Sequence, residues 1–165
     1  MKIRPILCMA LITTAFSLSA NAQTGDQADS EGTVHEHSGG EVGVAGTAVY
    51  LVTEKKFGFG LHLHYVHNIA ASKFGLGLGY ERIFADHKHN NIGLVVSFRP
   101  VEAFSIDLTP GLNFEQENPG AKFAVHLETT YEFEWNSIHL GPVMEFAYAT
   151  EDYHVSLGLH LGYDF

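Results

Sequence analysis

The last thirteen residues of the chain, 153–165, alternate without interruption between two kinds of side chain. The first set is entirely aliphatic or aromatic: Tyr153, Val155, Leu157, Leu159, Leu161, Tyr163 and Phe165. The second set is polar or small: His154, Ser156, Gly158, His160, Gly162 and Asp164. Because successive side chains of a β-strand point to opposite faces, this segment predicts a strand with one wholly apolar face. An apolar outer face, a polar inner face and aromatic residues near both ends are typical of a transmembrane barrel strand.

Seven earlier segments show a similar alternation, so that we predict eight strands in all. They span 44–53, 57–67, 73–84, 91–99, 103–115, 122–135 and 137–149. Each is about as long as a tilted strand that crosses a bilayer. Their polar faces are rich in Gly, Ser, Thr, His and Glu, as a narrow lumen requires, and lack the Lys-rich surface of a soluble sandwich. The predicted fold is all-β, an eight-stranded antiparallel transmembrane up-and-down β-barrel over residues 44–165. Pro110 and Pro142 predict bulges or irregular ends inside two strands, because proline cannot donate to the ladder.

The N-terminal segment has the pattern of a cleaved secretory signal peptide over residues 1–22. Lys2 and Arg4 precede a short apolar stretch at 6–18, and Ala-Asn-Ala at 20–22 is a small-residue cleavage site. A membrane anchor helix is disfavoured because the apolar stretch is too short. The single cysteine lies inside this segment, so we expect a mature chain without disulfides. Residues 23–43 lack an apolar period, which predicts a disordered periplasmic tail.

The chain resembles the small bacterial outer-membrane barrels, namely the transmembrane domain of outer membrane protein A and its X-type and W-type relatives. The resemblance is carried by the alternating strands over 44–165 and by the aromatic ending Tyr163-Asp164-Phe165. It implies a location in the cell outer membrane, contact with its lipid and recognition of the last strand by the barrel assembly machinery. It implies very little about activity. With both termini periplasmic, the segments 54–56, 85–90, 116–121 and 150–152 face outward and are short, which disfavours an adhesin or receptor role.

The net charge of the chain bears on which kinds of partner it can bind. The formal net charge is −10, which argues against nucleic-acid binding and is compatible with attraction of cations. The mean hydropathy of +0.02 would by itself suggest a soluble protein, but polar lumen residues dilute the apolar ones. We expect a monomer or an association with another membrane protein.

The chain contains eleven histidines, and six of them fall on the predicted lumen face. These six are His62, His64, His126, His139, His154 and His160. Hairpin registers predict an upper group and a lower group of lumen residues. The upper group is His126, Glu128, Glu145, His154 and Ser156. The lower group is Glu132, Glu134, His139 and His160. His62 and His64 are predicted to lie near Glu81, and Arg99 is predicted to pair with Asp107.

Mixed imidazole and carboxylate ligands suit Zn²⁺, Ni²⁺, Cu²⁺ or Fe²⁺, and so the lumen is a candidate metal site. The candidate ligands are His62, His64, Glu81, His126, Glu128, Glu145, His154 and His160. In the tail, His35 and His37 flank a glutamate in a segment that can wrap an ion. His87 and His89 form a further pair, which we interpret as part of a solvated loop. The structural alternative is that lumen histidines and carboxylates only satisfy one another, as the filled interior of a small barrel requires.

An enzymatic alternative rests on His154-Val155-Ser156, which resembles the His-x-Ser of the lipid A 3-O-deacylases. In that family the pair faces the membrane, whereas alternation here places His154 and Ser156 in the lumen, even though Glu145 could complete a triad. We therefore predict no catalytic residues and no organic cofactor. The function predicted from the sequence is binding, or helping to move, a divalent transition metal ion. The alternatives are a structural barrel for envelope integrity and, less favoured, a lipid A-modifying enzyme.

Overall fold

The computed structural model describes residues 39–85, 89–115, 120–150 and 152–165. The predicted signal peptide, most of the predicted tail with His35 and His37, and His87 lie outside the described residues. The strands are β1 (Gly40–Leu51), β2 (Lys56–Asn68), β3 (Phe74–Phe84), β4 (His89–Val101), β5 (Phe104–Glu115), β6 (Ala121–Tyr131), β7 (Phe133–Trp135), β8 (Ile138–Ala149) and β9 (Asp152–Asp164).

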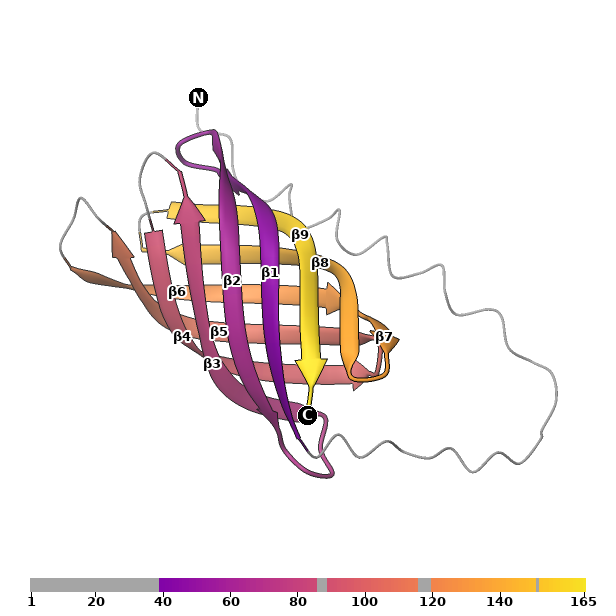
Figure 1. Cartoon of the computed structure of the whole chain (residues 1–165). Coiled ribbons are helices and arrows are strands. Elements are labelled where there is room, and N and C mark those ends of the chain that lie inside the picture. Colours follow the sequence, from indigo (N-terminus) through magenta and orange to yellow (C-terminus); the bar gives the residue numbers. More distant parts are fainter. Residues whose placement is uncertain (1–38, 86–88, 116–119, 151) are drawn as a thin grey trace, which may run out of the picture. The chain divides into compact units, whose positions relative to one another are not determined.

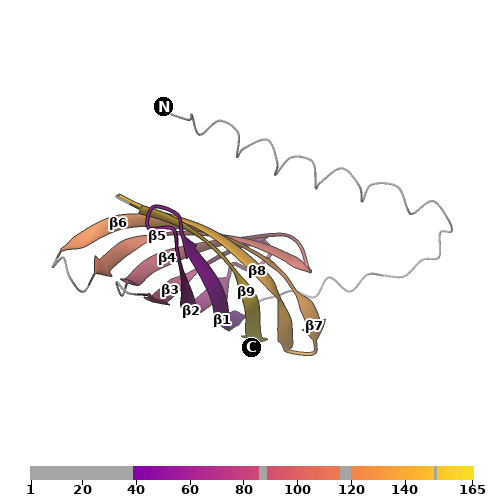
Figure 2. The same cartoon turned by 90° about the horizontal axis from the view of Figure 1, so that it is seen from above.

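These strands form one closed antiparallel sheet (Figures 1 and 2). The order is β6-β5-β4-β3-β2-β1-β9-β8-β7, and β6 also pairs with β8. β6 and β7 follow one another along β8 and pair with it in the same register. Together they therefore form one strand of the barrel wall with a short interruption. Both views show β1 beside β9, and their ladder closes the barrel between its first and last strands. The predicted eight-stranded antiparallel barrel is confirmed.

Side chains alternate in burial along every long strand, most regularly along β8. The large apolar side chains point outward and are exposed: Leu94 and Val101 on β4, for example, each keep 62% of their accessible surface. The inward positions are mainly polar, with a small apolar cluster of Val49, Leu51 and Ile83. This distribution is the reverse of that in a water-soluble domain and forms an apolar outer belt. Among the described residues, no helix has the length and apolar character needed to span a membrane.

The boundaries of the first strand differ from the prediction. β1 begins at Gly40 rather than residue 44, so that residues 40–43, which we had assigned to the tail, belong to the barrel. The reason is that Glu41 and Gly43 continue the inward phase of Ala45. A polar residue at an inward position weakens the apolar signal without ending the strand.

Of the two alternatives predicted at Pro110 and Pro142, the bulges are wrong, whereas the ladder is indeed irregular beside each proline. Beside Pro110, the β4–β5 ladder has no paired positions between Gly93↔Gly111 and Val96↔Leu108. Beside Pro142, the pairing of β8 with β6 and β7 is interrupted between Thr130↔Val143 and Phe133↔Leu140. The register is the same before and after each gap, because a missing N–H removes ladder bonds without adding a residue. The β4–β5 ladder shifts register elsewhere, between Phe98 and Val101.

Candidate metal centre

The lumen holds the histidines that the alternation predicted. His62, His64, His126, His139 and His160 are buried and His154 is half-buried. Their side chains come from β2, β6, β8 and β9, and they meet carboxylates from β1, β3, β6 and β8. Three groups bring at least three ligand atoms within 4.8 Å of one another. We call them the upper centre (Glu81, His126, Glu145, His154), the middle centre (His62, His64, Glu128) and the lower centre (Glu41, Glu132, His139, His160).

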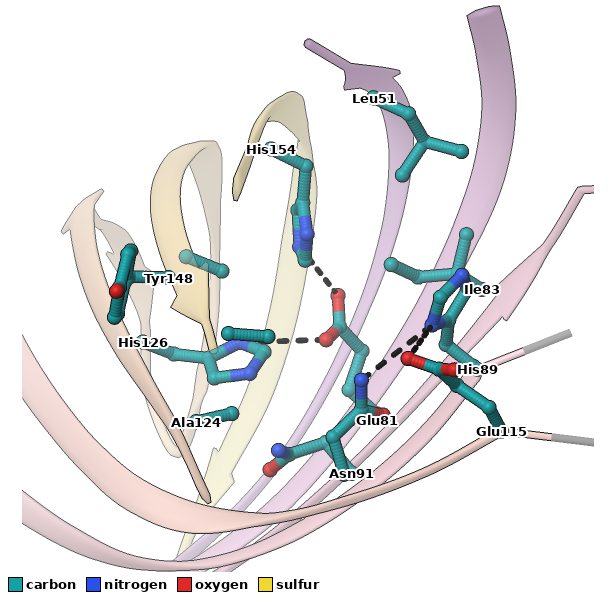
Figure 3. Close-up of a pocket in the computed structure, with 13 residues that line it drawn as sticks. Leu51, Glu81, Ile83, His89, Asn91, Glu115, Ala124, His126, Tyr148 and His154 are labelled. Atoms are coloured by element: carbon teal, nitrogen blue, oxygen red, sulfur yellow. Dashed lines mark hydrogen bonds and ion pairs between the residues drawn. The ribbon is translucent and has the colours of Figure 1, made fainter. Parts of the chain in front are cut away.

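In the upper centre, carboxylates and imidazoles alternate in a ring. His126 Nδ1 lies 3.3 Å from Glu81 Oε2 and 3.3 Å from Glu145 Oε2. His154 Nε2 lies 3.2 Å from Glu145 Oε1 and 3.7 Å from Glu81 Oε1. Figure 3 shows Glu81 between the two imidazoles. Each imidazole thus contacts both carboxylates, and each carboxylate contacts both imidazoles.

A small cavity adjoins this ring. Its volume is about 20 Å³, room for about one water-sized species. Glu81, His126 and His154 line it together with polar groups such as Asn91 and Glu115 (Figure 3). The upper centre is therefore a polar site with space beside its ligand atoms, rather than a fully packed contact.

The middle centre joins opposite walls of the barrel. His62 Nδ1 lies 2.7 Å from Glu128 Oε2, although β2 and β6 are separated in the sheet by three strands. The His62 and His64 rings are 5.5 Å apart, and His64 Nε2 lies 3.1 Å from Glu41 Oε1. His64 therefore connects the middle centre to the lower one.

The lower centre is organised around Glu41. His139 Nε2 lies 3.1 Å from Glu41 Oε1, and His160 Nε2 lies 3.8 Å from the same oxygen. Arg99 contacts the other oxygen of Glu41 and lies 3.7 Å from Glu132 Oε1. This arrangement brings a buried carboxylate, its guanidinium partner and several imidazoles to one end of the lumen.

The membership of these groups corrects several predictions. His62 is paired with Glu81 in the β2–β3 register, as expected, but its ring contacts Glu128. The carboxylate of Glu81 instead joins the upper centre, where we had placed Glu128. The interior is narrow enough for side chains to reach the opposite wall, so the partner is not the neighbour along the ladder.

Two further predictions about the lower end are wrong. Glu134 is exposed on β7 and is not part of the lower centre, although its register partner is His139. Arg99 forms its ion pairs with Glu41 and Glu132 rather than with Asp107. Glu134 was placed in the lumen by alternation along the predicted strand, but all three residues of β7 are exposed. The error over Arg99 arose because we had placed Glu41 in the tail, which left the lower centre without its central carboxylate. The inward phase of the alternation, extended back from Ala45, would have found it.

The arrangement of His154, Val155 and Ser156 agrees with the predicted alternation. Ser156 is 2% exposed and faces the lumen, opposite Glu145 in the β8–β9 register, while Val155 faces outward. His154 contacts Glu145 and Glu81. The hydroxyl is therefore turned away from the outer apolar belt, where an acyl chain would lie.

Neither a protein-family model nor a curated protein matches this chain. Solved structures do match, at low identity. The crystal structure of Neisserial surface protein A is 12% identical with a TM-score of 0.55, covering 76% of this chain and 96% of that one. The outer membrane protein Ail of Yersinia pestis, in a phospholipid bilayer nanodisc, is 13% identical with a TM-score of 0.54, covering 78% and 99%. A de novo designed transmembrane β-barrel is 14% identical with a TM-score of 0.54, covering 76% and 95%.

These likenesses show the fold of this chain. It is that of the small outer-membrane barrels, which confirms the fold implied by the sequence resemblance. The two bacterial barrels named above supply no assignment for the lumen histidines, and the interpretation of the three centres depends on their own geometry.

Proposed function

We propose that this protein spans the bacterial outer membrane and binds a divalent transition metal ion in its lumen, at the upper centre. The membrane location is supported by the apolar outer belt and by the likeness to outer-membrane barrels. The wall strands are long enough to cross a bilayer, and the closed ladder leaves no edge exposed to lipid.

The observation that carries the metal proposal is the spacing of the ring in the upper centre. Ligand atoms held at about 2.0–2.2 Å from a tetrahedral ion lie about 3.3–3.6 Å from one another. The four nitrogen–oxygen distances in the ring run from 3.2 to 3.7 Å. The nitrogen–oxygen spacings of the upper centre are therefore close to those between the ligands of a tetrahedral ion, which supports the proposal.

The chemistry of the ring indicates which ions it would take. Two imidazoles with two carboxylates suit Zn²⁺, Ni²⁺, Cu²⁺ or Fe²⁺ better than the all-oxygen shells that Ca²⁺ and Mg²⁺ prefer. The adjoining cavity, which is lined in part by polar groups, leaves room beside the ring. His35 and His37 would act as an accessory capture site in the tail, in keeping with their His-Glu-His sequence.

Calorimetric titration of the refolded, detergent-solubilised mature chain with Zn²⁺ and Ni²⁺ tests this proposal. The double variant Glu81→Gln with Glu145→Gln keeps the shape of the ring and removes both carboxylate ligands. Glu134→Gln is the matched control, because this carboxylate is exposed outside the centres. We expect at least one binding event to disappear in the double variant and to persist in the control.

A second arm separates the barrel from the tail. Deleting residues 23–38 removes no part of strands β1 to β9, so that binding at the upper centre should survive the deletion. Binding that disappears with the tail, or that is unchanged in the double variant, would contradict the proposal. Complete absence of binding would favour the structural alternative, in which carboxylates and imidazoles only satisfy each other's hydrogen-bonding groups.

A further inference from the structure

We propose that Glu41, His64, His139 and His160 form a second, separate site for a tetrahedral divalent transition metal ion, which fastens the seam between the first and last strands. This site, which we call the seam site, does not require that the upper centre binds an ion. The experiment below distinguishes the two.

The first argument is convergence on one oxygen atom. The Nε2 atoms of His64, His139 and His160 lie 3.1, 3.1 and 3.8 Å from Glu41 Oε1. These values bracket the separation of about 3.3–3.6 Å between ligands of a tetrahedral ion. Three imidazole nitrogens and one carboxylate oxygen are a complete ligand set for such an ion.

The strand register explains how these residues meet. In the sheet order β2, β1, β9 and β8, the positions His64, Gly43, Gly162 and His139 form one row. A Cβ atom at Gly43 or Gly162 would overlap a histidine ring. The two glycines therefore leave the space into which the imidazoles from the flanking strands fold.

The second argument is a buried imidazole that makes no hydrogen bond. His160 is 1% exposed, and neither of its ring nitrogens has a hydrogen-bond partner. Its ring stacks between His64 and His139, with centroid distances of 5.0 and 5.2 Å. Burying an unsatisfied polar group is costly, so native structures generally avoid it. An ion bound by Nε2 would satisfy the nitrogen that faces Glu41.

The groups around the seam site orient its ligands. His139 Nδ1 lies 3.2 Å from Asp164 Oδ2, so that a proton on Nδ1 is held by the carboxylate and the lone pair of Nε2 faces the site. Carboxylate–histidine–metal arrangements of this kind are common around bound zinc. Arg99 contacts the second oxygen of Glu41, which leaves Oε1 for the ion.

The local charge also favours a divalent cation. Glu41, Glu132 and Asp164 supply three carboxylates around the site, and Arg99 supplies one positive charge. With neutral imidazoles as ligands, two negative charges remain, and one divalent ion balances them. Burial makes such a balance important, because an uncompensated charge in the interior is costly.

An ion at this place would link four neighbouring strands. Glu41 and His160 belong to β1 and β9, whose ladder joins the two ends of the barrel segment, and His64 and His139 add β2 and β8. The expected consequence is a barrel whose seam opens less readily when the ion is bound, since an ion that binds only the folded state stabilises it.

Co²⁺ is the probe for the test, because tetrahedral Co²⁺ with nitrogen and oxygen ligands has a strong visible absorption and octahedral Co²⁺ does not. The metal-stripped full chain, refolded in detergent, is titrated with Co²⁺. In the background Glu81→Gln with Glu145→Gln, which removes the carboxylate ligands of the upper centre, we expect one equivalent of tetrahedral signal that disappears when His160→Phe is added. The phenylalanine keeps a ring between His64 and His139 while it removes both nitrogens.

Two further variants guard against misfolding and indirect effects. Asp164→Asn retains all four ligands and loses only the carboxylate behind His139, so we expect Co²⁺ affinity to fall about 10- to 100-fold. His67→Ala removes an exposed histidine of β2 and should leave the signal unchanged. With Glu81→Gln and Glu145→Gln present, a tetrahedral signal that persists when His160→Phe is added, or the absence of any such signal before it is added, would overturn the seam site. A signal that depends on Glu81 and Glu145 alone would do the same while it supported the upper centre.

Discussion

His62 and Glu128 lie 66 residues apart in the chain and face each other across the lumen, with 2.7 Å between Nδ1 and Oε2. Their strands, β2 and β6, are not neighbours in the sheet, so this contact ties two walls together rather than two adjacent strands. Both side chains are buried. The net contribution of such a buried pair to stability is smaller than the free-energy cost of removing one partner and leaving the other buried.

Glu128→Ala should therefore be strongly destabilising. The substitution leaves the imidazole of His62 buried without its acceptor, and breaking a buried pair costs about 3–5 kcal/mol. The single tryptophan, Trp135, is exposed on β7 and reports urea unfolding by its fluorescence in detergent micelles.

Glu134→Ala serves as the control, because its exposed carboxylate should contribute less than about 0.5 kcal/mol. The double variant His62→Leu with Glu128→Leu should recover most of the loss, since it leaves no buried charge unpaired. Equal unfolding midpoints for Glu128→Ala and Glu134→Ala would show that the cross-lumen pair does not stabilise the barrel.

A positive charge on the outer belt should be costly in proportion to its depth. Leu94 lies near the middle of β4 and Val101 at its end, and both side chains are 62% exposed. In phospholipid vesicles, Leu94→Arg should reduce the free energy of unfolding by about 2–4 kcal/mol and Val101→Arg by about 0–1 kcal/mol. Reversible urea unfolding measures both. Similar losses for the two variants would mean that the belt does not lie across the hydrocarbon as proposed.

A methyl group at Gly77 should be poorly tolerated. A Cβ atom there would overlap the backbone carbonyl of Tyr65 on the neighbouring strand, which cannot move aside as a flexible side chain would. Gly77→Ala should therefore cost about 1–3 kcal/mol. At Gly120 nothing lies within 4 Å of the added atom, and Gly120→Ala should be close to neutral. The two urea midpoints decide the matter, and a neutral Gly77→Ala would contradict the close approach of β2 and β3.

The turn between β2 and β3 offers a stabilising change. Ala71 has a φ of 56°, in the left-handed region, where a side chain costs about 1–2 kcal/mol. Ala71→Gly should remove that cost and lose only about 0.4–1 kcal/mol to the freer unfolded chain, a net gain of about 0.5–1 kcal/mol. Ala70→Gly, at the preceding position without a positive φ, should be destabilising. Thermal unfolding of the two variants should shift in opposite directions, and a shift in the same direction would refute the argument.

The strands themselves were predictable because they depend on a local property. An outward side chain must be apolar and an inward one small or polar, so a period of two residues marks both the strand and its faces. The predicted 137–149 and observed Ile138–Ala149 illustrate this agreement. Glu41 was missed at the boundary, where an acidic residue beside a Gly-rich segment has the composition of a tail. The inward position of Glu41 can be recognised only when the strand is known to extend back beyond residue 44.

The partners of the lumen residues were less predictable. Neighbours along a hairpin follow from the turn, and Glu145 does lie opposite Ser156 as expected. The contact between His62 and Glu128 follows instead from the closure of the sheet, which brings two walls within reach of each other. The same is true of Arg99, whose ion pairs with Glu41 and Glu132 span β1, β4 and the junction of β6 and β7.

The sequence alone thus determined the number of wall strands, the face that each presents to the exterior and the presence of histidines and carboxylates inside. These properties depend on alternation, which every strand carries independently of the others. Only the tertiary structure decided which imidazole meets which carboxylate, and that Glu41 stands at the centre of three of them. The physical reason is that contacts across a lumen depend on closure, tilt and diameter, which no single strand or hairpin contains.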